Sequence, residues 1–437
     1  MCTFLTTSAL LWSMSAEVRL QRTGDRVVIT LELVLRPGTA MFDYEDQILE
    51  AVNQAGRVMT GECLAEFDTD GAPIVIAGTK LTSKGRVEKG YQTPYGVAPV
   101  ARHVYQSSAG GPTFCPLDQA ARIVNSTTPR FAKMCSWKYA MMNSKAARED
   151  LLENHQRDVS RCYLQDIAEE VGAIAEAKEE HWQYAEPEME AVVASASVGI
   201  DGTCMLFCEE GWRQAMVGTL SLYDVMGERL HTVYVAAPPE YGRETFCAKM
   251  DGEIQRLKQR YKGVEWIGLA DGAHDNWSWL EQRTDRAILD FWHAAGYLEK
   301  AAGAVCPSLK ERPAWFEQAR HRLKEEKGAA AELLEEMQTA LAGGKARGAV
   351  RKDLQAAMTY FKNHLSKMDY AQYQKECLPI GSGVTEAACK TVVKQRLCGS
   401  GMKWKYSGAA TVLRLRSLAL TKGRWGQFWS KISRFGF

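Results

Sequence analysis

The sequence predicts an α/β protein built on a mixed sheet of five strands with a large all-α insertion. Two short apolar runs, residues 191–200 and 264–270, each lead into an Asp-Gly pair, which is typical of buried strands bounded by turns. Residues 311–369 are rich in Ala, Glu, Lys and Leu, a composition that favours helix. Three further strand-like segments lie near the apolar runs, at 212–223, 229–236 and 287–291.

The N-terminal region, residues 1–110, is predicted to be α+β with a β-ribbon. Residues 26–35 alternate and are rich in Val, Ile and Thr, which indicates a strand, and residues 43–55 have the pattern of a helix. Residues 86–105 combine Gly, Pro and Val with aromatic residues, which favours a β-ribbon. Residues 1–85 carry no functional motif, so their role stays open.

Residues 111–175 are predicted to form a helical DNA-binding domain. A helix begins at Pro116, and two short amphipathic segments follow at 146–155 and 158–171. Two such helices joined by a break are typical of a helix-turn-helix, whose second helix presents its N-terminal half to DNA. An ordinary helical hairpin is the alternative. The candidate DNA-binding residues of the second helix are Arg157, Ser160, Arg161 and Gln165.

The remaining boundaries follow from the same patterns. Residues 176–190 are acidic and polar and predict a linker helix before the first part of the core, residues 191–300. Within that part, residues 242–261 have helical periodicity, and the last strand leads through His293 into a helix. The all-α insertion spans residues 301–377, and residues 378–437 complete the core.

The C-terminal segment, residues 378–437, is strongly basic and contains a single acidic residue, Glu386. It holds 11 Lys and Arg against this 1 acidic residue, a local charge of about +10, whereas the whole chain carries +1. Cations in such a segment neutralise phosphates and give salt-dependent affinity for nucleic acid. The candidate DNA-binding residues here are Lys390, Lys394, Arg396, Lys403, Lys405, Arg414 and Arg416.

Aromatic residues are interleaved with these cations. Trp404 and Tyr406 lie among the lysines, and Trp425 and Trp429 follow. They are candidates for stacking on unpaired bases, with packing in the core of a terminal helix as the alternative for the last two.

Three carboxylates are candidates for one metal site. Asp201 and Asp271 follow the two apolar runs, and Glu386 lies on a later helix that Ser382 could cap. An ionised group at a buried strand end needs a partner, and Mg²⁺ takes carboxylate oxygens together with substrate phosphate. Two such ions support phosphoryl transfer. A capping role on a solvated helix is the alternative for Glu386, and Asp275 and Asp290 are rival carboxylates.

Composition places the chain among soluble proteins of a reducing compartment. Its 12 cysteines are scattered without a C-x-x-C pair, so free thiols are expected. The first residues are apolar but lack a basic leader, and charges follow too soon for a membrane span, so neither a signal peptide nor a transmembrane helix is expected. A cytoplasmic protein with no membrane partner fits these features.

Several segments, in this order, resemble the ISKra family of bacterial insertion-sequence transposases. The resemblance extends from about Gly90 to Trp429. The segments that carry it are Gly199-Ile-Asp-Gly-Thr, Gly211-Trp-Arg-Gln-Ala-Met-Val-Gly-Thr, Ala270-Asp-Gly-Ala, Ile288-Leu-Asp-Phe-Trp-His, Met368-Asp-Tyr, Ile380-Gly-Ser-Gly-Val-Thr-Glu-Ala-Ala-Cys-Lys, Val393-Lys-Gln-Arg-Leu and Gly401-Met-Lys-Trp.

The resemblance implies a DDE transposase with an RNase H-like core, in which Asp201, Asp271 and Glu386 match the acidic triad. It implies two Mg²⁺ ions, or Mn²⁺ in their place, and an accessory position near His293, for which packing in the core is the alternative. The implied partners are double-stranded DNA, namely the terminal inverted repeats and the target, and further copies of the chain in a dimer or higher oligomer. A nuclease that does not join DNA and a catalytically silent DNA-binding protein remain alternatives.

Overall fold

The computed structural model describes residues 16–23, 26–34, 40–306, 308–344 and 346–437. The described chain is a mixed α/β protein that divides into two compact units. One unit extends to Ile174 and includes Trp429–Phe437, and the other comprises Ala175–Phe428. No helix in the described ranges is long and apolar enough to cross a membrane. Residues 1–15, on which the expectation about a signal peptide rested, lie outside those ranges.

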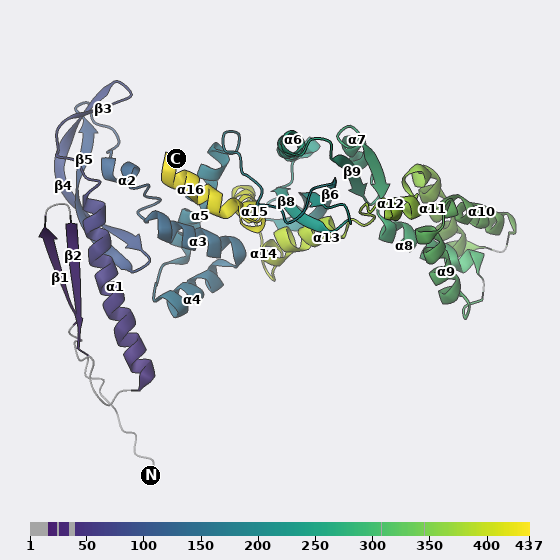
Figure 1. Cartoon of the computed structure of the whole chain (residues 1–437), viewed down its shortest axis with the longest axis horizontal. Coiled ribbons are helices and arrows are strands. Elements are labelled where there is room, and N and C mark those ends of the chain that lie inside the picture. Colours follow the sequence, from purple (N-terminus) through teal and green to yellow (C-terminus); the bar gives the residue numbers. More distant parts are fainter. Residues whose placement is uncertain (1–15, 24–25, 35–39, 307, 345) are drawn as a thin grey trace, which may run out of the picture. The chain divides into compact units, whose positions relative to one another are not determined.

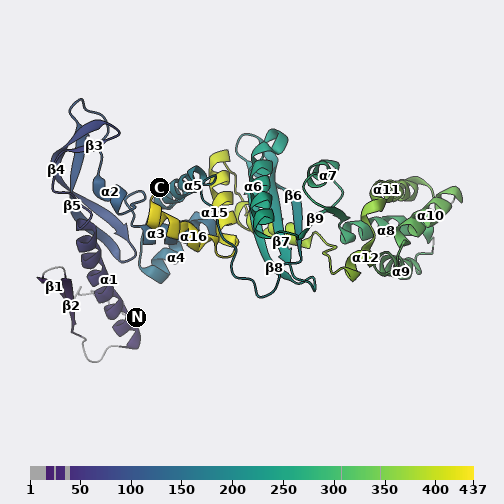
Figure 2. The ribbon, with the colours of Figure 1, turned by 45° about the horizontal axis from the view of Figure 1, so that its top comes forward.

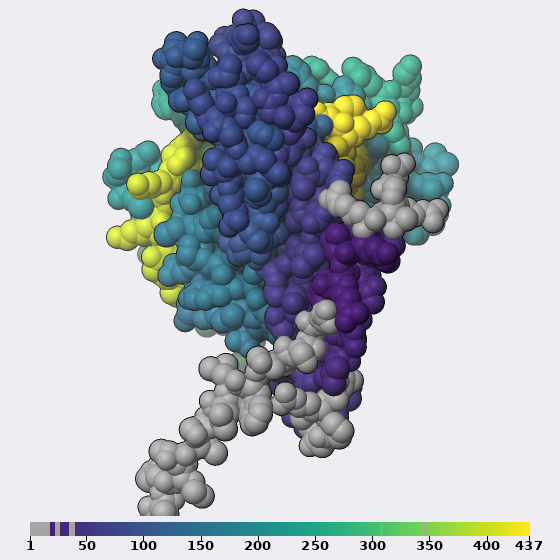
Figure 3. Space-filling model, turned by 90° about the vertical axis from the view of Figure 1, so that its left-hand side faces the viewer, coloured from purple at the N-terminus to yellow at the C-terminus, as the bar shows by residue number. Residues whose placement is uncertain are grey.

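The first unit combines two small antiparallel sheets with helices (Figure 1). Figure 3 shows its surface, with α1 and the long β4–β5 ribbon in purple and blue. The ribbon packs on α1, and its core includes Leu64, Tyr91 and Val100. The elements are β1 (Ala16–Thr23), β2 (Arg26–Leu33), α1 (Met41–Ala65), β3 (Ile74–Ile76), β4 (Thr79–Thr93), β5 (Gly96–Ser107), α2 (Pro116–Ala120), α3 (Pro129–Met141), α4 (Ser144–His155) and α5 (Arg161–Ala177).

The second unit contains the five-stranded mixed sheet that the sequence predicts. Its strand order is β10-β9-β6-β7-β8, in which β6, β7 and β8 are antiparallel neighbours and β9 and β10 run parallel to β6. The strands are β6 (Ser195–Phe207), β7 (Gly211–Tyr223), β8 (Arg229–Ala237), β9 (Glu265–Ala270) and β10 (Arg286–Leu289).

Helices cover both faces of this sheet. Gly218 of β7 lies against side chains of α6 (Glu244–Arg260), whereas Gly199 of β6 lies against Thr385 of α13 (Gly383–Ala388). Gly199 pairs with Thr219, the neighbour of Gly218, and successive strand residues point to opposite faces, so α6 and α13 cover opposite faces. Figure 2 shows α6 lying along the strands.

Helices α8 to α12 follow β10 as an all-α segment, called the insertion below, which begins at Phe291, ten residues before the predicted boundary at residue 301. Helix α8 starts beside the sheet and packs against α9, α10 and α11, and the pair Gly343-Gly344 lies between α10 and α11 (Figures 1 and 2). The bounds are α8 (Phe291–Val305), α9 (Arg312–Glu325), α10 (Ala329–Ala342), α11 (Gly348–His364), the short 3₁₀ turn η2 (Leu365–Lys367) and α12 (Tyr370–Lys375).

The chain then returns to the sheet and ends in helices. After α13 come a π-helical turn, η3 (Cys389–Lys394), α14 (Gln395–Leu397), α15 (Tyr406–Leu420) and α16 (Arg424–Phe435). Helix α15 packs on β8. The remaining short elements are the 3₁₀ turn η1 (Tyr241–Arg243) and α7 (His274–Leu280).

Two predictions about elements are wrong. The linker predicted as a helix begins inside α5, which ends at Ala177, and no helix follows before β6. The strand predicted to end at Asp201 continues to Phe207, because β6 keeps its antiparallel pairing with β7 beyond the last residue, Gly199, that pairs with β9. Gly202 is therefore a strand residue and does not form a turn.

Candidate active site

Asp201 lies within β6, just past the point where β9 stops pairing with it. It is two residues from Gly199, so its side chain points to the sheet face that α13 covers. The Gly202 backbone N–H donates to Asp201 Oδ1 at 2.6 Å, and the Cys389 thiol donates to Oδ2 at 3.5 Å. Burial raises the pKa of Asp201, and the nearby charges of Asp271 and Glu386 add to that rise. A cation at this position would relieve both effects.

Asp271 is the first residue after β9, as the sequence predicts. Gly272 follows with φ +104°, a backbone conformation that favours glycine, and lets the chain turn at once. The turn is held by the Ala273 N–H, which donates to Asp271 Oδ1 at 3.2 Å, and by the Tyr360 hydroxyl, which donates to the Asp271 carbonyl at 2.6 Å. Tyr360 belongs to α11, so the insertion contacts the site directly.

Glu386 lies on α13, and a close contact brings this helix to the sheet. The Thr385 hydroxyl lies 2.7 Å from that of Thr219 on β7, in a buried hydrogen bond. A Cβ atom at Gly199 would lie only 2.1 Å from Thr385 Oγ1, so this approach requires glycine on β6. The Glu386 side chain is 49% exposed and accepts a hydrogen bond from Ser382 Oγ at 2.9 Å.

The three predicted carboxylates line one cavity of about 130 Å³. Asp201 comes from the middle of a strand, Asp271 from the end of the neighbouring strand and Glu386 from a helix on the face above them. Together they offer only oxygen donors, the set that Mg²⁺ prefers, with space for water or a phosphate oxygen. The residues that line the cavity are Ile200, Asp201, Ala270, Asp271, His293, Ser382, Thr385 and Glu386.

A buried carboxylate, Asp290, connects this cavity to the start of α8. It is 0% exposed and caps α8 by accepting from the Trp292 N–H at 3.0 Å. Its other oxygen, Oδ2, lies 3.1 Å from Ser382 Oγ and 3.2 Å from His293 Nδ1. Because Ser382 Oγ also contacts Glu386, one hydroxyl links the buried and the exposed carboxylate. The side chain of Ser382 therefore does not cap α13 as predicted.

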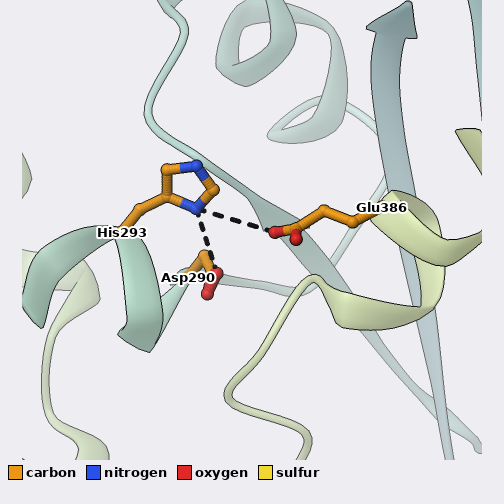
Figure 4. Close-up of side chains that lie close together, drawn as sticks. All are labelled: Asp290, His293 and Glu386. Carbon is orange, nitrogen blue, oxygen red and sulfur yellow. Dashed lines mark hydrogen bonds and ion pairs between the residues drawn. The ribbon is translucent and has the colours of Figure 1, made fainter. Parts of the chain in front are cut away.

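His293 points from α8 toward both carboxylates, as Figure 4 shows. Its Nδ1 lies 3.8 Å from Glu386 Oε1, and one ligand atom from each of Asp290, His293 and Glu386 falls within 4.8 Å of the others. The hydrogen bond to Asp290 raises the pKa of His293 most, burial opposes the rise, and the charges of Asp290, Asp271 and Glu386 add to it. His293 thus lies at the edge of the carboxylate cavity, and its accessory role stays a prediction.

The rival carboxylates have different positions. Asp275 is 83% exposed and lies 3.8 Å from His274 Nδ1, so it is a surface residue outside the cavity. Asp290 is at the centre of the hydrogen bonds described above. In the sequence, Asp290 can be recognised as a carboxylate between the apolar strand β10 and the helix α8, which it caps.

The basic residues of the C-terminal segment divide into exposed and buried groups. The exposed group consists of lysines that project from η3 and from the loop before α15, namely Lys390, Lys394, Lys403 and Lys405. Arg414 is mostly buried and pairs with Glu176 at 2.6 Å. Trp425 and Trp429 are buried, as the alternative of core packing expects, whereas Tyr406 is 49% exposed.

Two arginines of the C-terminal segment that were predicted to bind DNA are buried instead. Arg416 is 3% exposed and donates to the carbonyls of Thr391 and Val392 in η3, and burial lowers its pKa to about 10. Arg396 is also 3% exposed, and its guanidinium lies 5.2 Å from the centre of the Trp404 ring. These placements indicate that both side chains stabilise the fold around the π-helical turn.

The candidate DNA-binding residues near α5 also differ in exposure. Arg157 is buried, donates to the Thr93 carbonyl at 3.0 Å and contacts the Phe131 ring, so it supports the first unit. Ser160 caps the start of α5. Ser160, Arg161 and Gln165 are exposed, as a recognition helix requires.

Searches of known proteins add no family to this picture. No protein-family model matches the chain, and no curated protein matches it.

Proposed function

We propose that this protein is a DNA transposase of the DDE type, which cuts DNA and joins the cut end to a target. The observation that carries the proposal is the convergence of Asp201, Asp271 and Glu386 on one cavity, from two adjacent parallel strands and a helix. The strand order of the sheet, with three antiparallel strands followed by two parallel ones, supports an RNase H-like core. The resemblance of the sequence to ISKra transposases points the same way.

The carboxylates fit Mg²⁺ because they are oxygen donors around a small cavity whose charges repel one another. Asp201, Asp271 and Glu386 would hold the metal, and His293 lies at the edge of the same cavity. When bound, two such ions activate a nucleophile and stabilise a leaving oxygen in phosphoryl transfer. The donor set is the same for a nuclease and a transposase, so it supports both reactions equally.

The side chains around the carboxylates hold them in place. The hydroxyl of Ser382 donates to Glu386 or to Asp290, which fixes the Glu386 carboxylate against the sheet. The Tyr360 hydroxyl and the left-handed Gly272 hold the turn that carries Asp271. Such preorganisation places reacting groups before chemistry begins.

The proposed reaction has two steps. Water attacks a phosphodiester at the end of the element, a new P–O bond forms, and the bond to the 3′ oxygen breaks and leaves a 3′-hydroxyl. That hydroxyl then attacks a target phosphodiester, and the displaced target oxygen leaves with a proton. The exposed lysines, Lys390, Lys394, Lys403 and Lys405, would neutralise the DNA backbone near the cavity.

The test is an assay of cleavage and joining on labelled DNA that carries the terminal repeat of the element, with Mg²⁺. We expect joined products from the wild type and from Asp275→Asn, an exposed carboxylate outside the cavity, but none from Asp271→Asn. Metal-dependent cleavage without joining would instead identify a nuclease. Tight DNA binding without chemistry by the wild type would contradict the enzymatic proposal.

A further inference from the structure

A second, larger cavity lies beside the carboxylate site. It has a volume of about 450 Å³ and is formed by the start of α8, one face of α9 and the loop before α13. That volume is within the range of small-molecule sites and suits a single nucleoside. Neither the metal site nor the lysines described above use this cavity.

An exposed tryptophan, Trp292, lines the cavity. Its ring packs edge-on against Phe291, with 5.3 Å between ring centres, and a Cβ atom at Gly381 would lie 3.7 Å from its Cδ1. The residue is nevertheless 61% exposed. The Arg320 guanidinium lies 5.6 Å from the centre of the ring. An aromatic ring positioned by its neighbours and open to a cavity is a natural platform for a flat ligand.

The polar residues of the cavity provide both hydrogen-bond donors and acceptors. Arg320 and Lys324 donate, whereas Glu317 and Glu325 accept, and each cation lies near one carboxylate, at 2.5 Å and 3.6 Å. The formal charges of these four groups cancel. A phosphate would meet carboxylates here, whereas a nucleobase offers donors and acceptors along its edge and a flat face to stack.

Adjacent residues line the two cavities. Trp292 lines the larger cavity and its neighbour His293 the carboxylate cavity. Similarly, Ile380 lines the larger cavity and Ser382 the carboxylate cavity. The two cavities are therefore neighbours at the start of α8 and at the loop before α13. A phosphate at the carboxylates would leave a neighbouring base within reach of Trp292.

We propose that this cavity binds an unpaired base of the nucleotide next to the phosphate that is cut, by stacking it on Trp292 beside Arg320. The inference rests on the proposed function, because it assumes that DNA lies at the carboxylates. It adds that the enzyme separates a base from its partner at the cut end and holds it between α8, α9 and the loop before α13. An abasic nucleotide at that position would lose this contact while keeping its phosphate.

The test compares binding of two DNA probes by wild type and variants, measured by fluorescence anisotropy with Ca²⁺ in place of Mg²⁺, so that a cation bound by oxygen ligands is still present at the carboxylates. The probes are a labelled duplex with a short single-stranded tail and the same duplex with its first tail nucleotide abasic. For the wild type we expect the abasic change to weaken binding by about 5- to 150-fold, the range of one base–aromatic stack. Trp292→Ala should bind the intact tail more weakly than wild type by the same factor, and should bind the abasic tail as wild type does. Trp292→Phe should keep most of the difference in affinity between the two tails.

The matched control is Trp212→Ala, because Trp212 of β7 is 63% exposed but lies outside the cavity. It should keep the full effect of the abasic nucleotide. A wild type that binds both tails equally, or a Trp292→Ala variant that still responds to the abasic nucleotide, would overturn the base-binding inference and leave the proposed function standing. A wild type that binds neither DNA would overturn both.

Discussion

Replacing Gly199 by alanine tests whether the close approach of α13 to β6 positions Glu386. The added methyl would lie 2.1 Å from Thr385 Oγ1, whereas ordinary contacts begin at 3.4 Å, so the Thr385 hydroxyl would have to rotate away or α13 would have to withdraw by up to about 1.3 Å. The move would stretch the buried Thr219–Thr385 hydrogen bond. Overpacking of this kind costs about 1–3 kcal/mol, and the lost hydrogen bond costs about 1 kcal/mol.

The same displacement moves Glu386, the next residue after Thr385. A shift of about 1 Å at a reacting group can reduce a rate by about 100-fold. We therefore expect Gly199→Ala to unfold at lower denaturant concentration, to bind Mg²⁺ more weakly by calorimetry, and to lose cleavage beyond what its stability explains.

The control for this prediction is Gly252→Ala. Gly252 lies within α6, and an added Cβ atom there meets nothing within 4 Å. Alanine should therefore stabilise that helix by up to about 1 kcal/mol and leave metal binding unchanged. If Gly199→Ala instead matched Gly252→Ala in stability and in metal affinity, the contact between α13 and β6 would not position the site.

Three further predictions concern the insertion, pH and DNA. Tyr360→Phe removes a hydrogen bond to the Asp271 carbonyl, so it should lose about 1 kcal/mol of stability and weaken Mg²⁺ binding in calorimetry. Tyr297→Phe changes the ring stacked on Tyr360 and should have neither effect. Equal effects of the two substitutions would contradict a positioning role for the Tyr360 hydroxyl. Burial lowers the pKa of His231 to about 4, so the folded state resists protonation and stability falls as pH drops below about 6.5. In denaturant titrations, wild type should lose about 2 kcal/mol more unfolding free energy between pH 7 and pH 5 than His231→Phe. Parallel plots of unfolding free energy against pH for the two proteins would refute this. Lys403→Ala should reduce the slope of log binding constant against log salt concentration by about 1, because Lys403 is exposed. Arg416→Ala should mainly lower the melting temperature, because Arg416 is buried. The reverse pattern would contradict these two roles.

Strands of the sheet were predictable because their apolar patterns are local. The predicted segments 212–223, 229–236 and 264–270 match β7, β8 and β9 to within one residue at each end. The true end of β6 was harder to predict, because an Asp-Gly pair is a turn signal only where the partner strand also ends. Here β7 continues to pair with β6, and the chain turns later, between Phe207 and Gly211.

The first unit was less predictable because its elements depend on contacts between distant segments. Helix α1 extends ten residues beyond the predicted end at residue 55, since its later turns pack on the β4–β5 ribbon. Helix α3 was not predicted at all. Its buried residues include Ser136, whose hydroxyl bonds back to the Ala132 carbonyl, and neither feature is visible in a pattern of apolar residues.

The roles of single charged residues could be predicted only in part. The positions of Asp201, Asp271 and Glu386 at one cavity follow from strands and helices that the sequence indicates. A count of basic residues, in contrast, does not separate an exposed lysine such as Lys394 from a buried arginine such as Arg416. The π-helical turn η3 has backbone carbonyl groups that need hydrogen-bond donors, and Arg416 of α15 donates to two of them.

The geometry of the insertion explains how so many residues can separate Asp271 from Glu386 in the chain without separating them in space. The insertion leaves the sheet at Asp290 and returns at Ile380, and the Phe291 N–H donates to the Ile380 carbonyl at 2.9 Å, which joins its two ends. Ser382 adds a second link to Asp290 at the same place. Because the ends of the insertion meet beside the carboxylates, a rearrangement at the start of α8 or in the loop before α13 would move the residues that contact Glu386. In the proposed function the insertion is therefore part of the active site, since Tyr360 of α11 bonds to the Asp271 carbonyl and His293 of α8 lies 3.8 Å from Glu386.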